Sequence, residues 1–577
     1  MIDAEKILRE TYPEFKVGKK NKFILKVLKT IWHEDDFNEV IEKNQHLRGF
    51  AFLDKFFKYF KFSYQVSPDS YNNIPSEGRL VIVANHPIGT LDGLALVKLI
   101  RTVRPDVRIV ANQVLSYVEP LKSVFLTVDV LSGKSNKQAY KAMLAALKNE
   151  EAVILFPAGE VSRITPKGVY DGQWQTGFLK LAKKAKAPIL PIHIKASNSA
   201  LFYAASTLYK PMGTMLLVQE MFNKKNKELK FKVGLPIPYP AFSNAEEGNK
   251  ELCQRFRKHV LNLGKKHKKA LFETIETVAH PVNSKALKKA LYQSRLLGET
   301  KDGKKIFLYH YHGDCPVMLE IARLRELTFR TVEEGTGENQ DIDKYDVYYS
   351  HLVLWDEHDL EIVGSYRIGD GHEIMENRGV NGFYTSTLFD LSAAFQCYLP
   401  HSIELGRSFV QPRYWGQRSL DYLWYGIGAY LRENPEIKYM FGPVSLSNAY
   451  PEVAKDVLIS FYQQQFGSDL QLAKARTPFI VSEAAHKFAQ SEFSGDYKTS
   501  FKILNSELKK LGVKVPTLYK QYVELCTEQG CHFIDFNIDP NFNNCIDSLV
   551  MIELKNITEK KRQRYIERAV GTPAHAL

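Results

Sequence analysis

Residues 80–92 have the sequence LVIVANHPIGTLD. An uninterrupted apolar run rich in β-branched residues is typical of a strand that is buried on both faces of a parallel sheet. His86 and Asp92 follow this run within a short segment that also contains Pro87 and Gly89. This stretch therefore predicts an α/β sheet in which the end of one strand carries polar side chains able to do chemistry.

The rest of the chain repeats this alternation of apolar runs and amphipathic stretches. A first region has predicted strands at 107–112, 152–157 and 187–194, and predicted helices near 136–149 and 175–186. A second region has predicted strands at 306–311, 351–356, 361–368, 401–410 and 439–446, and predicted helices near 316–330, 418–433 and 451–465. The two regions show no internal repeat of each other. The sequence therefore predicts two different α/β domains.

The length of 577 residues supports this division, because single domains usually hold about 100–200 residues. A composition of 44% hydrophobic residues excludes a mainly disordered chain. We expect amphipathic helices over 1–70, a first α/β domain over 71–285, a connector at 286–300 and a second domain over 301–577. The six cysteines are too few and scattered for a disulfide framework.

Charge is distributed unevenly along the chain. Residues 1–290 hold 47 Lys and Arg against 27 Asp and Glu, a net +20, whereas the remainder holds 31 against 38, a net −7. A basic half points to a polyanionic partner, which is a nucleic acid or an anionic membrane. Because the chain lacks helix-turn-helix and zinc-finger patterns, we expect no nucleic acid as a partner.

Two basic, aromatic segments near the N-terminus bear on the membrane. Residues 22–32 and 50–62 thread lysines between phenylalanines and leucines at helical spacing. Such helices lie in a membrane interface, or else pack on their own domain. No apolar run approaches the length of a transmembrane helix, and the N-terminus has no signal-peptide core. We expect a cytoplasmic protein that is peripheral on the inner face of the bacterial cytoplasmic membrane.

The His86 and Asp92 pair can act as a base and its orienting carboxylate. A carboxylate that accepts one ring N–H fixes the tautomer and makes the other nitrogen more basic toward a substrate hydroxyl. A capping or packing histidine is the alternative. Residues 156–163 then have the sequence FPAGEVSR, which offers backbone donors and a cation to an anionic group. The strand 189–194, ILPIHI, follows.

The order His-Asp, Phe-Pro-x-Gly and Pro-Ile resembles the PlsC-like glycerolipid acyltransferases. The resemblance implies that His86 is the general base, that Asp92 orients it, and that the acceptor's anionic headgroup is bound by a further set, namely Gly159, Glu160, Ser162 and Arg163. The chain departs from the family in two places. Five residues separate His86 from Asp92 instead of four, and Phe-Pro-Ala-Gly-Glu replaces Phe-Pro-Glu-Gly-Thr. Both departures resemble the branch that acylates amino-acid lipids.

The second region carries its own group of polar residues. The strand at 401–410, HSIELGRSFV, holds Glu404, Arg407 and Ser408, and a turn with arginines and Gly416 precedes the next helix. A strand, a polar turn and a helix N-terminus together can cradle the phosphate of a phosphopantetheine arm. Glu404 is a candidate base for an amine nucleophile, although a glutamate in a strand often only faces water.

With the segments ARLRELTFR (322–330), DKYD (343–346) and IVGSYR (362–367), this strand resembles GNAT-like N-acyltransferases that make lyso-ornithine lipid and are related to acyl-homoserine-lactone synthases. The resemblance covers roughly residues 300–555. It implies that Glu404 is the base and that the donor or amino-acid site is lined by Arg325, Asp346, Arg367, Arg407 and Ser408. A structural ion pair is the alternative for Arg325 and Arg367.

The two resemblances together predict a bifunctional ornithine-lipid synthase. The C-terminal domain would transfer a 3-hydroxyacyl group from acyl-carrier protein to the ornithine α-amine, and the N-terminal domain would O-acylate the new hydroxyl. The expected partners are acyl-carrier protein, or acyl-CoA as donor, an anionic membrane surface, and the amino-acid and lyso-lipid substrates. No bound cofactor and no metal is expected. The alternatives are a glycine, lysine or glutamine lipid, and a lysophospholipid acyltransferase whose GNAT-like domain only binds carrier protein.

Overall fold

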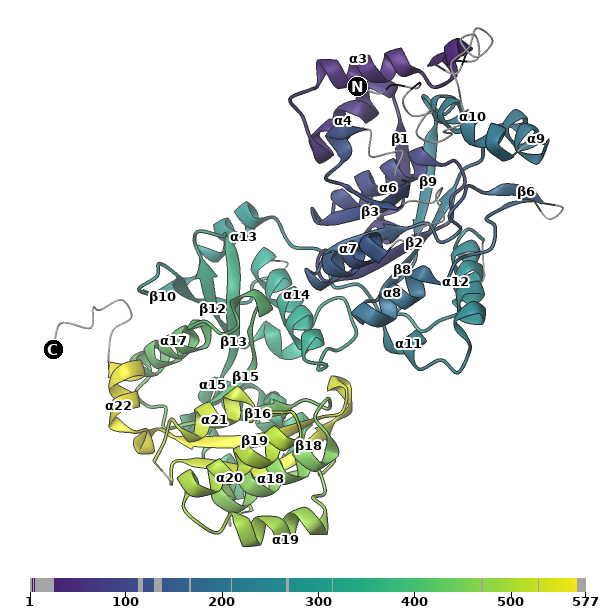
Figure 1. The fold of residues 1–577 in the computed structure, drawn as a ribbon. Coiled ribbons are helices and arrows are strands. Elements are labelled where there is room, and N and C mark those ends of the chain that lie inside the picture. Colours follow the sequence, from purple (N-terminus) through teal and green to yellow (C-terminus); the bar gives the residue numbers. More distant parts are fainter. Residues whose placement is uncertain are drawn as a thin grey trace. The chain divides into compact units, whose positions relative to one another are not determined.

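The computed structural model describes residues 3, 5, 25–27, 29–112, 118–128, 137–165, 168–208, 210–265, 269–313, 315–468, 471–527 and 529–567. The chain forms two units, residues 1–280 and 281–577 (Figure 1). Each unit has its own sheet and its own hydrophobic clusters. Both are α/β units, as the sequence predicts.

The N-terminal unit is built on a seven-stranded sheet. The strand order is β1-β9-β8-β2-β5-β3-β4, and the neighbours are parallel except for the antiparallel pair β8 and β9. The strands are β1 (Ser63–Val66), β2 (Leu80–Ala84), β3 (Val107–Asn112), β4 (Phe125–Val128), β5 (Ala152–Leu155), β8 (Ile189–Lys195) and β9 (Glu228–Val233). A small hairpin, β6 (Arg163–Thr165) and β7 (Gly168–Tyr170), follows β5.

Strand β2 lies in the middle of this sheet and is buried along its whole length. Leu80, Ile82 and Ala84 belong to the hydrophobic cluster on one face, and Val81 and Val83 belong to the cluster on the other. This explains the uninterrupted apolar run, since helices cover both faces. The first face packs against α3 (Glu34–Lys43), α4 (Gly49–Phe60), α6 (Thr90–Arg101) and α10 (Lys210–Phe222), and the second packs against α7 (Lys137–Lys148), α8 (Gly177–Ala185) and α12 (Asn249–Leu263).

Helix α4 corrects the interfacial interpretation of residues 50–62. Phe52, Phe56 and Phe60, the rings expected to enter a membrane, are 1–2% exposed within the core of the N-terminal unit. Lys55 and Lys58 lie on the exposed face of the helix. The helix is therefore amphipathic because it packs on its own domain. In the earlier segment at 22–32, only residues 25–27 and 29–32 are described.

No helix among the described residues is both long enough and apolar enough to span a bilayer.

The C-terminal unit has an eight-stranded sheet in the order β10-β11-β12-β13-β15-β16-β19-β18. All neighbours are antiparallel except β15 and β16, which are parallel because helix α17 (Ser419–Glu433) connects them. The strands are β10 (Arg295–Glu299), β11 (Lys305–His310), β12 (Ser350–Asp356), β13 (Glu361–Asp370), β15 (Ser402–Val410), β16 (Tyr439–Leu446), β18 (Cys531–Asp539) and β19 (Cys545–Glu553). The final hairpin and β10 were not predicted from the sequence.

Strands β15 and β16 separate part-way along their length. They pair only from Ser402 to Glu404 on β15 and from Tyr439 to Phe441 on β16. Beyond these residues β15 continues to pair with β13, and β16 continues to pair with β19. A β-bulge lies just after the point of separation, because Arg407 and Ser408 oppose a single residue of β13 and Arg407 has a φ of 47°. The sheet is thus opened at its centre.

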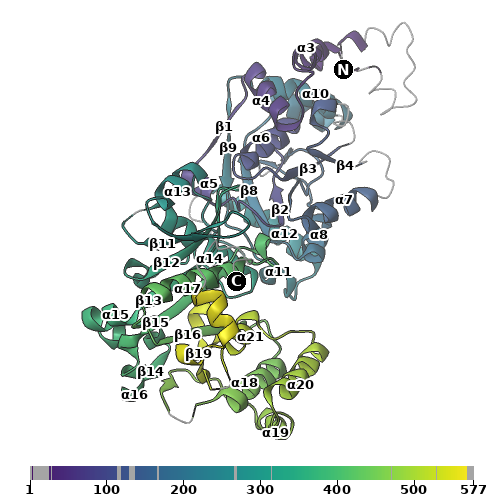
Figure 2. The ribbon, with the colours of Figure 1, turned by 90° about the vertical axis from the view of Figure 1, so that its left-hand side faces the viewer.

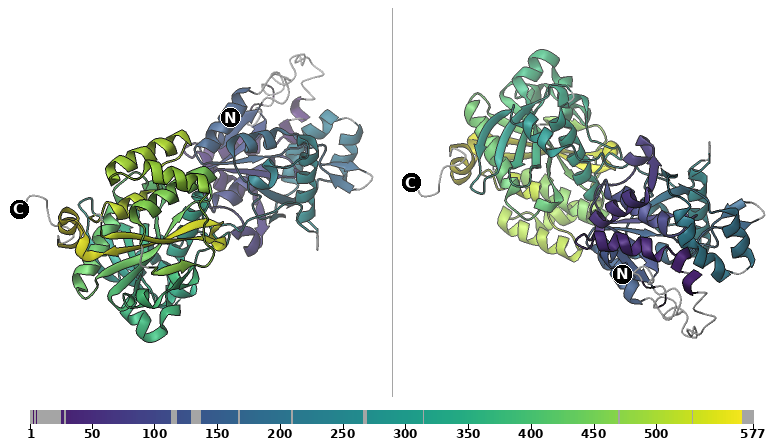
Figure 3. Two further views of the ribbon diagram at one scale, coloured as in Figure 1. Left: turned by 90° about the horizontal axis from the view of Figure 1, so that it is seen from below. Right: turned by 90° about the horizontal axis from the view of Figure 1, so that it is seen from above.

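Helices cover both faces of this sheet. Helix α14 (Pro316–Thr331) and helix α13 (Ser284–Leu291) pack on one face, and α17 packs on the other. Helices α18 (Glu452–Phe466), α19 (Glu483–Glu492) and α20 (Tyr497–Lys510) gather beside β18 (Figures 1 and 2). The hairpin of β18 and β19 is yellow in Figure 3. Helix α21 (Thr517–Val523) packs in the same cluster as α17.

The joint between the units differs from the expected connector at 286–300. That stretch forms α13 and β10, and the division falls between His280 and Pro281. Nε2 of His280 hydrogen-bonds to the Ile74 carbonyl in the N-terminal unit at 2.8 Å. The Val282 amide donates to Glu320 in the C-terminal unit at 3.2 Å. The joint is therefore a single residue, Pro281, between two anchored neighbours.

Replacement of Phe56 by alanine tests the position of α4. We expect a loss of about 3–5 kcal/mol in the free energy of unfolding, because the change leaves a cavity among the packed rings. Urea denaturation followed by circular dichroism measures it, and Lys55→Ala on the exposed face is the matched control, with an expected change within about 0.5 kcal/mol. An unchanged stability together with weaker binding to anionic vesicles would support the interfacial interpretation instead.

Candidate active sites

The loop between β2 and α6 places His86 against Asp92. Asp92 is fully buried in the first turn of α6, where its Oδ2 accepts hydrogen bonds from the amides of Ile88 at 2.7 Å and Gly89 at 3.0 Å. Nδ1 of His86 lies 3.3 Å from the same oxygen. The imidazole also stacks on Phe156 at 4.0 Å between ring centroids. The carboxylate thus faces Nδ1, which leaves Nε2 as the nitrogen able to take a proton from a substrate.

Asp171 joins this loop to the segment that follows β5, and sequence reasoning missed it. Its Oδ1 accepts from the His86 amide at 3.1 Å and from the Ser162 hydroxyl at 2.5 Å. Its Oδ2 accepts from the indole N–H of Trp174 at 3.0 Å. The Ser162 amide in turn donates to the His86 carbonyl at 2.7 Å. One buried carboxylate therefore fixes His86 relative to the FPAGEVSR segment, and Ser162 is a member of this framework.

The remaining residues of that segment differ in their surroundings. Gly159 has a φ of 68°, which a residue with a side chain rarely adopts. The Glu160 side chain is 42% exposed, and its Oε2 lies 3.5 Å from Nη2 of Arg163. Nε and Nη1 of Arg163 are buried and have no hydrogen-bond partner among the described residues. Two unsatisfied donors on a buried guanidinium can bind an oxyanion.

The C-terminal unit contains a cavity of about 380 Å³ where β15 and β16 separate. Its walls come from both separated strands, from the end of α14, from α21 and from the β18–β19 hairpin. Among the residues that line it are Thr328, Phe329, Glu334, Tyr366, Tyr384, Leu405, Arg407, Ser408, Trp415, Ser445, Tyr450, Tyr522, Cys545 and Asp547. A hollow of this size that opens between parallel strands can accept an extended acyl or pantetheine chain.

Two residues predicted for the second site, Arg407 and Ser408, line this cavity. The Arg407 guanidinium lies 3.2 Å from Asp341 and 3.4 Å from Asp343, and it donates to the Tyr384 hydroxyl at 3.2 Å. It also packs over the ring of Phe542 at 4.2 Å. The bulge in β15 therefore places the charged side chain of Arg407 in the cavity wall. Two carboxylates, Asp341 and Asp343, fix its position.

Arg325, Asp346 and Arg367 form a buried ion-pair network, and Asp343 joins it to Arg407, at 2.7 Å from Arg367 and 3.4 Å from Arg407. The side chains of Arg325, Asp346 and Arg367 are each about 1% exposed. Oδ1 of Asp346 lies 2.8 Å from Arg325 and 3.2 Å from Arg367. Burial opposes ionisation, but the two guanidinium groups hold the pKa of Asp346 well below its usual value. None of the three lines the cavity, so the geometry favours the structural alternative for these residues.

Glu404 is also buried, 1% exposed, and it does not line the cavity. Its oxygens accept from the Thr385 amide at 2.7 Å and hydroxyl at 2.5 Å, and from the Tyr384 amide at 3.1 Å. The Tyr349 hydroxyl donates to it as well. Burial raises the pKa of Glu404 although these donors oppose the rise. The side chain holds the turn that carries Tyr384, and the predicted role as a base stays a prediction.

Sequence reasoning missed two carboxylates at the cavity. Glu334 follows α14 and accepts a hydrogen bond from the Ser445 hydroxyl at 2.8 Å, and burial raises its pKa to about 7. Asp547 lies on β19, and burial raises its pKa well above the usual value. No motif marked either one, because the strand β19 was not predicted and Glu334 lies in a loop.

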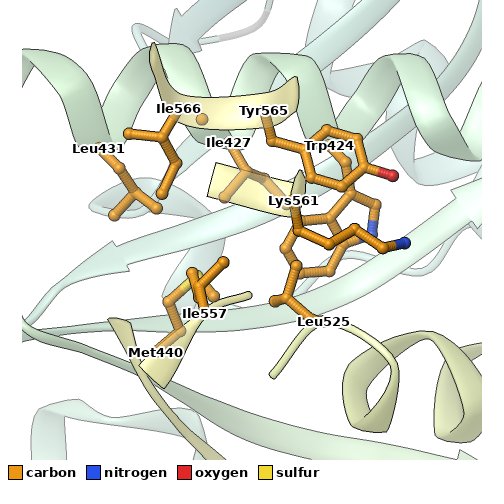
Figure 4. A pocket seen from close by; sticks show the side chains of 10 residues that line it. Trp424, Ile427, Leu431, Met440, Leu525, Ile557, Lys561, Tyr565 and Ile566 are labelled. Carbon is orange, nitrogen blue, oxygen red and sulfur yellow. The ribbon is translucent and has the colours of Figure 1, made fainter. Parts of the chain in front are cut away.

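A second hollow lies between α17 and the turn 563–567 (Figure 4). Its lining is mostly apolar, with Trp424, Ile427 and Met440 among the side chains that face it. At about 10 Å³ it holds one water molecule at most. It is therefore a packing defect and not a substrate site.

Comparisons with known proteins identify both units. Residues 6–266 match the family model described as Acyltransferase, and residues 324–425 match the Acetyltransferase (GNAT) domain. Over 317 residues the chain is 34% identical to the glycine N(alpha)-acyltransferase of Phocaeicola vulgatus, which covers 52% of this chain and 96% of that protein. The chain belongs to the GNAT acyltransferases. It carries a second acyltransferase domain ahead of the GNAT domain, and both units are α/β as predicted.

Two further relatives each match part of the chain. The lyso-glycine lipid O-acyltransferase of Bacteroides thetaiotaomicron is 28% identical over 253 residues, which is 43% of this chain and 92% of that protein. The L-ornithine N(alpha)-acyltransferase of Brucella abortus is 33% identical over 151 residues, which is 23% of this chain and 50% of that protein. The chain is thus similar to one N-acyltransferase and one O-acyltransferase over nearly their full lengths.

Removal of the Asp171 carboxylate tests its role in the N-terminal acyltransferase domain. We expect Asp171→Ala to lower acyl transfer by this domain about 10- to 100-fold, since the His86 loop loses its fixed position. A radiolabelled acyl-transfer assay measures the rate, and Asp69→Asn, at an exposed site in the same unit, is the control. A rate equal to the wild type would exclude Asp171 as a positioning residue.

The raised pKa of Glu334 predicts a pH-dependent stability. Because the folded state binds the Glu334 proton more tightly than the unfolded state, the free energy of unfolding falls as pH rises from about 4.5 to about 7. We expect the wild type to lose up to about 3 kcal/mol relative to Glu334→Gln over this range. Urea denaturation of both proteins at a series of pH values measures the difference, and parallel curves would contradict the expectation.

Proposed function

We propose that the enzyme builds a two-chain amino-acid lipid by two consecutive acyl transfers. The GNAT domain acylates the α-amine of an amino acid with a 3-hydroxyacyl group, and the N-terminal domain then acylates the hydroxyl of that chain. One observation carries the proposal. A single chain is similar to an N-acyltransferase for glycine over 52% of its length and to an O-acyltransferase for lyso-glycine lipid over 43%.

The geometry of the N-terminal site supports the second transfer. His86 takes the proton from the substrate hydroxyl through Nε2 while Asp92 stabilises the imidazolium that forms. The hydroxyl oxygen attacks the carbonyl of an acyl thioester, and the thiolate leaves. Arg163 carries two unsatisfied buried donors and binds the carboxylate of the amino-acid headgroup. Gly159, Glu160 and Ser162 shape the loop that presents it.

The open sheet of the GNAT domain supports the first transfer. A thioester arm enters between β15 and β16, and the cavity takes the acyl chain. The donor is acyl-carrier protein or acyl-CoA. Carrier proteins are acidic, so the basic surface of residues 1–290 favours the former as the donor to the N-terminal domain. Glycine is the favoured amino acid, because over nearly the full length of the relative the chain is 34% identical to a glycine enzyme but 25% identical to the L-ornithine N(alpha)-acyltransferase of Rhodobacter capsulatus.

The same basic surface supports a peripheral location on the inner face of the cytoplasmic membrane. Residues 1–290 carry a net charge of +20. On β9, Lys230 and Lys232 are exposed while Leu229 and Phe231 point into the core. Lysines on such a surface attract anionic headgroups, where the lyso-lipid substrate resides. The expected attraction weakens at high salt.

Expression in a host that lacks amino-acid lipids tests the proposal. Lipid mass spectrometry should detect a phosphorus-free lipid with one amide-linked and one ester-linked chain on glycine, or on ornithine if that is the true substrate. His86→Ala should leave only the single-chain form, because O-acylation loses its base, with a fall of about 10²- to 10⁴-fold. Glu404→Ala should reduce both products, since the Tyr384 turn loses its anchor.

The Asp69→Asn enzyme should make both lipids at the wild-type level and serves as the control. A normal yield of two-chain lipid from His86→Ala would show that another group acts as the base. A wild-type enzyme that makes no amino-acid lipid but restores growth to a strain lacking lysophosphatidate acylation would instead establish a lysophospholipid acyltransferase with a carrier-binding GNAT domain.

A further inference from the structure

Asp547 is a buried carboxylate that faces the cavity of the GNAT domain. It is 7% exposed and lines the hollow between β15 and β16. Its side chain forms no hydrogen bond and no ion pair with any described residue. A buried, ionisable group without a partner is costly, and such groups are usually satisfied by a ligand. A cationic group of a bound ligand would satisfy this carboxylate.

Glu334 and Asp547 have Ser445 as a common neighbour. Ser445 on β16 is the cross-strand partner of Asp547 on β19, so both side chains project from the same face of the sheet. The Ser445 hydroxyl donates to Glu334 at 2.8 Å. Both carboxylates line the same cavity, and their charges repel each other. Asp539 adds further negative potential, which Arg407 opposes from the adjacent wall.

We propose that Asp547 and Glu334 bind the α-ammonium group of the amino-acid substrate and that Asp547 accepts its proton. This inference rests on the proposed function, because it assumes an amine acceptor. A pair of buried carboxylates recognises a compact, small ammonium group, and the cavity places that group beside the thioester that enters where the strands separate. Arg407, on the same cavity wall, faces the carboxylate of the amino acid.

The proton balance follows from this arrangement. The substrate enters as an ammonium ion, and one proton passes to the Asp547 carboxylate to give a neutral amine and a neutral acid. Burial favours this transfer, since it penalises both charged forms. The amine nitrogen attacks the acyl thioester carbonyl, the C–S bond breaks, and the second N–H proton goes to the departing thiolate. The products are an amide and a free thiol, and Asp547 returns its proton to solvent.

The position of Asp547 separates the role of the base from the role of Glu404. Glu404 is held by donors from Thr385, Tyr384 and Tyr349, and it does not reach the cavity. A base must lie within hydrogen-bond distance of the proton that it removes. Asp547 meets this requirement from the cavity wall, whereas Glu404 positions Tyr384 behind it. Asp547 therefore transfers the proton, and Glu404 positions the loop.

Purified full-length enzyme with glycine and a 3-hydroxyacyl thioester tests the inference. Glycine has a single nitrogen, so any effect on its acylation reports on the α-amine. We expect Asp547→Asn to lower kcat for amide formation about 10²-fold or more. Glu334→Gln should mainly raise the KM for glycine, about 10-fold. Asp390→Asn, an exposed carboxylate in the same unit, is the matched control and should keep both constants.

O-acylation of an added lyso-lipid by the same preparations serves as an internal measure of folding. It should be equal in the wild type and in all three variants. If wild-type enzyme acylates no amino acid, the proposed function itself fails. If the wild type is active and Asp547→Asn retains its kcat and KM, the inference is wrong. If Asp547→Asn loses both activities through misfolding, Glu334→Gln decides: a raised KM for glycine supports the inference, and an unchanged KM overturns it.

Discussion

The separation of β15 from β16 is the constraint on which the C-terminal unit depends. The two strands give up their mutual backbone hydrogen bonds after Glu404 and Phe441, and exposed backbone donors and acceptors then need other partners. Gly442 permits the strands to approach closely just where they part, because a Cβ there would lie 2.0 Å from the Leu405 carbonyl oxygen. The cavity, the bulge at Arg407 and the carboxylates of the final hairpin are all arranged around this opening.

The two acyltransferase units place their candidate sites in different parts of the sheet. In the N-terminal unit, parallel strands end at one edge, and Asp171 ties the loops that follow β2 and β5 into a single framework around His86. In the C-terminal unit, the cavity lies inside the sheet, between β15 and β16. A hydroxyl is a poor nucleophile that needs a strong, oriented base, whereas an amine needs only to lose its ammonium proton. The two kinds of site match these two demands.

Local patterns in the sequence predicted much of this arrangement, and long-range contacts account for what they missed. The apolar run at 80–84 identified the central strand, and His86 and Asp92 lie together because both flank one short loop. The burial of Phe52 and Phe56 was not predictable, since an amphipathic helix has the same pattern against a membrane or a core. Asp171 had no signal, because its contact with the His86 amide joins residues that are distant in sequence. Asp547 had none either, because strand β19, which brings it to the cavity, was not predicted. Glu404 was found by its motif, but only the fold shows its four donors.

The two acyltransferase domains are linked by one residue, Pro281. His280 is bonded within one unit and Val282 within the other, so a single residue joins two domains that each have their own core. Short tethers give effective concentrations on the order of millimolar. Under the proposed two-step synthesis, the covalent joint makes the second encounter of a single-chain lipid with the enzyme a local event.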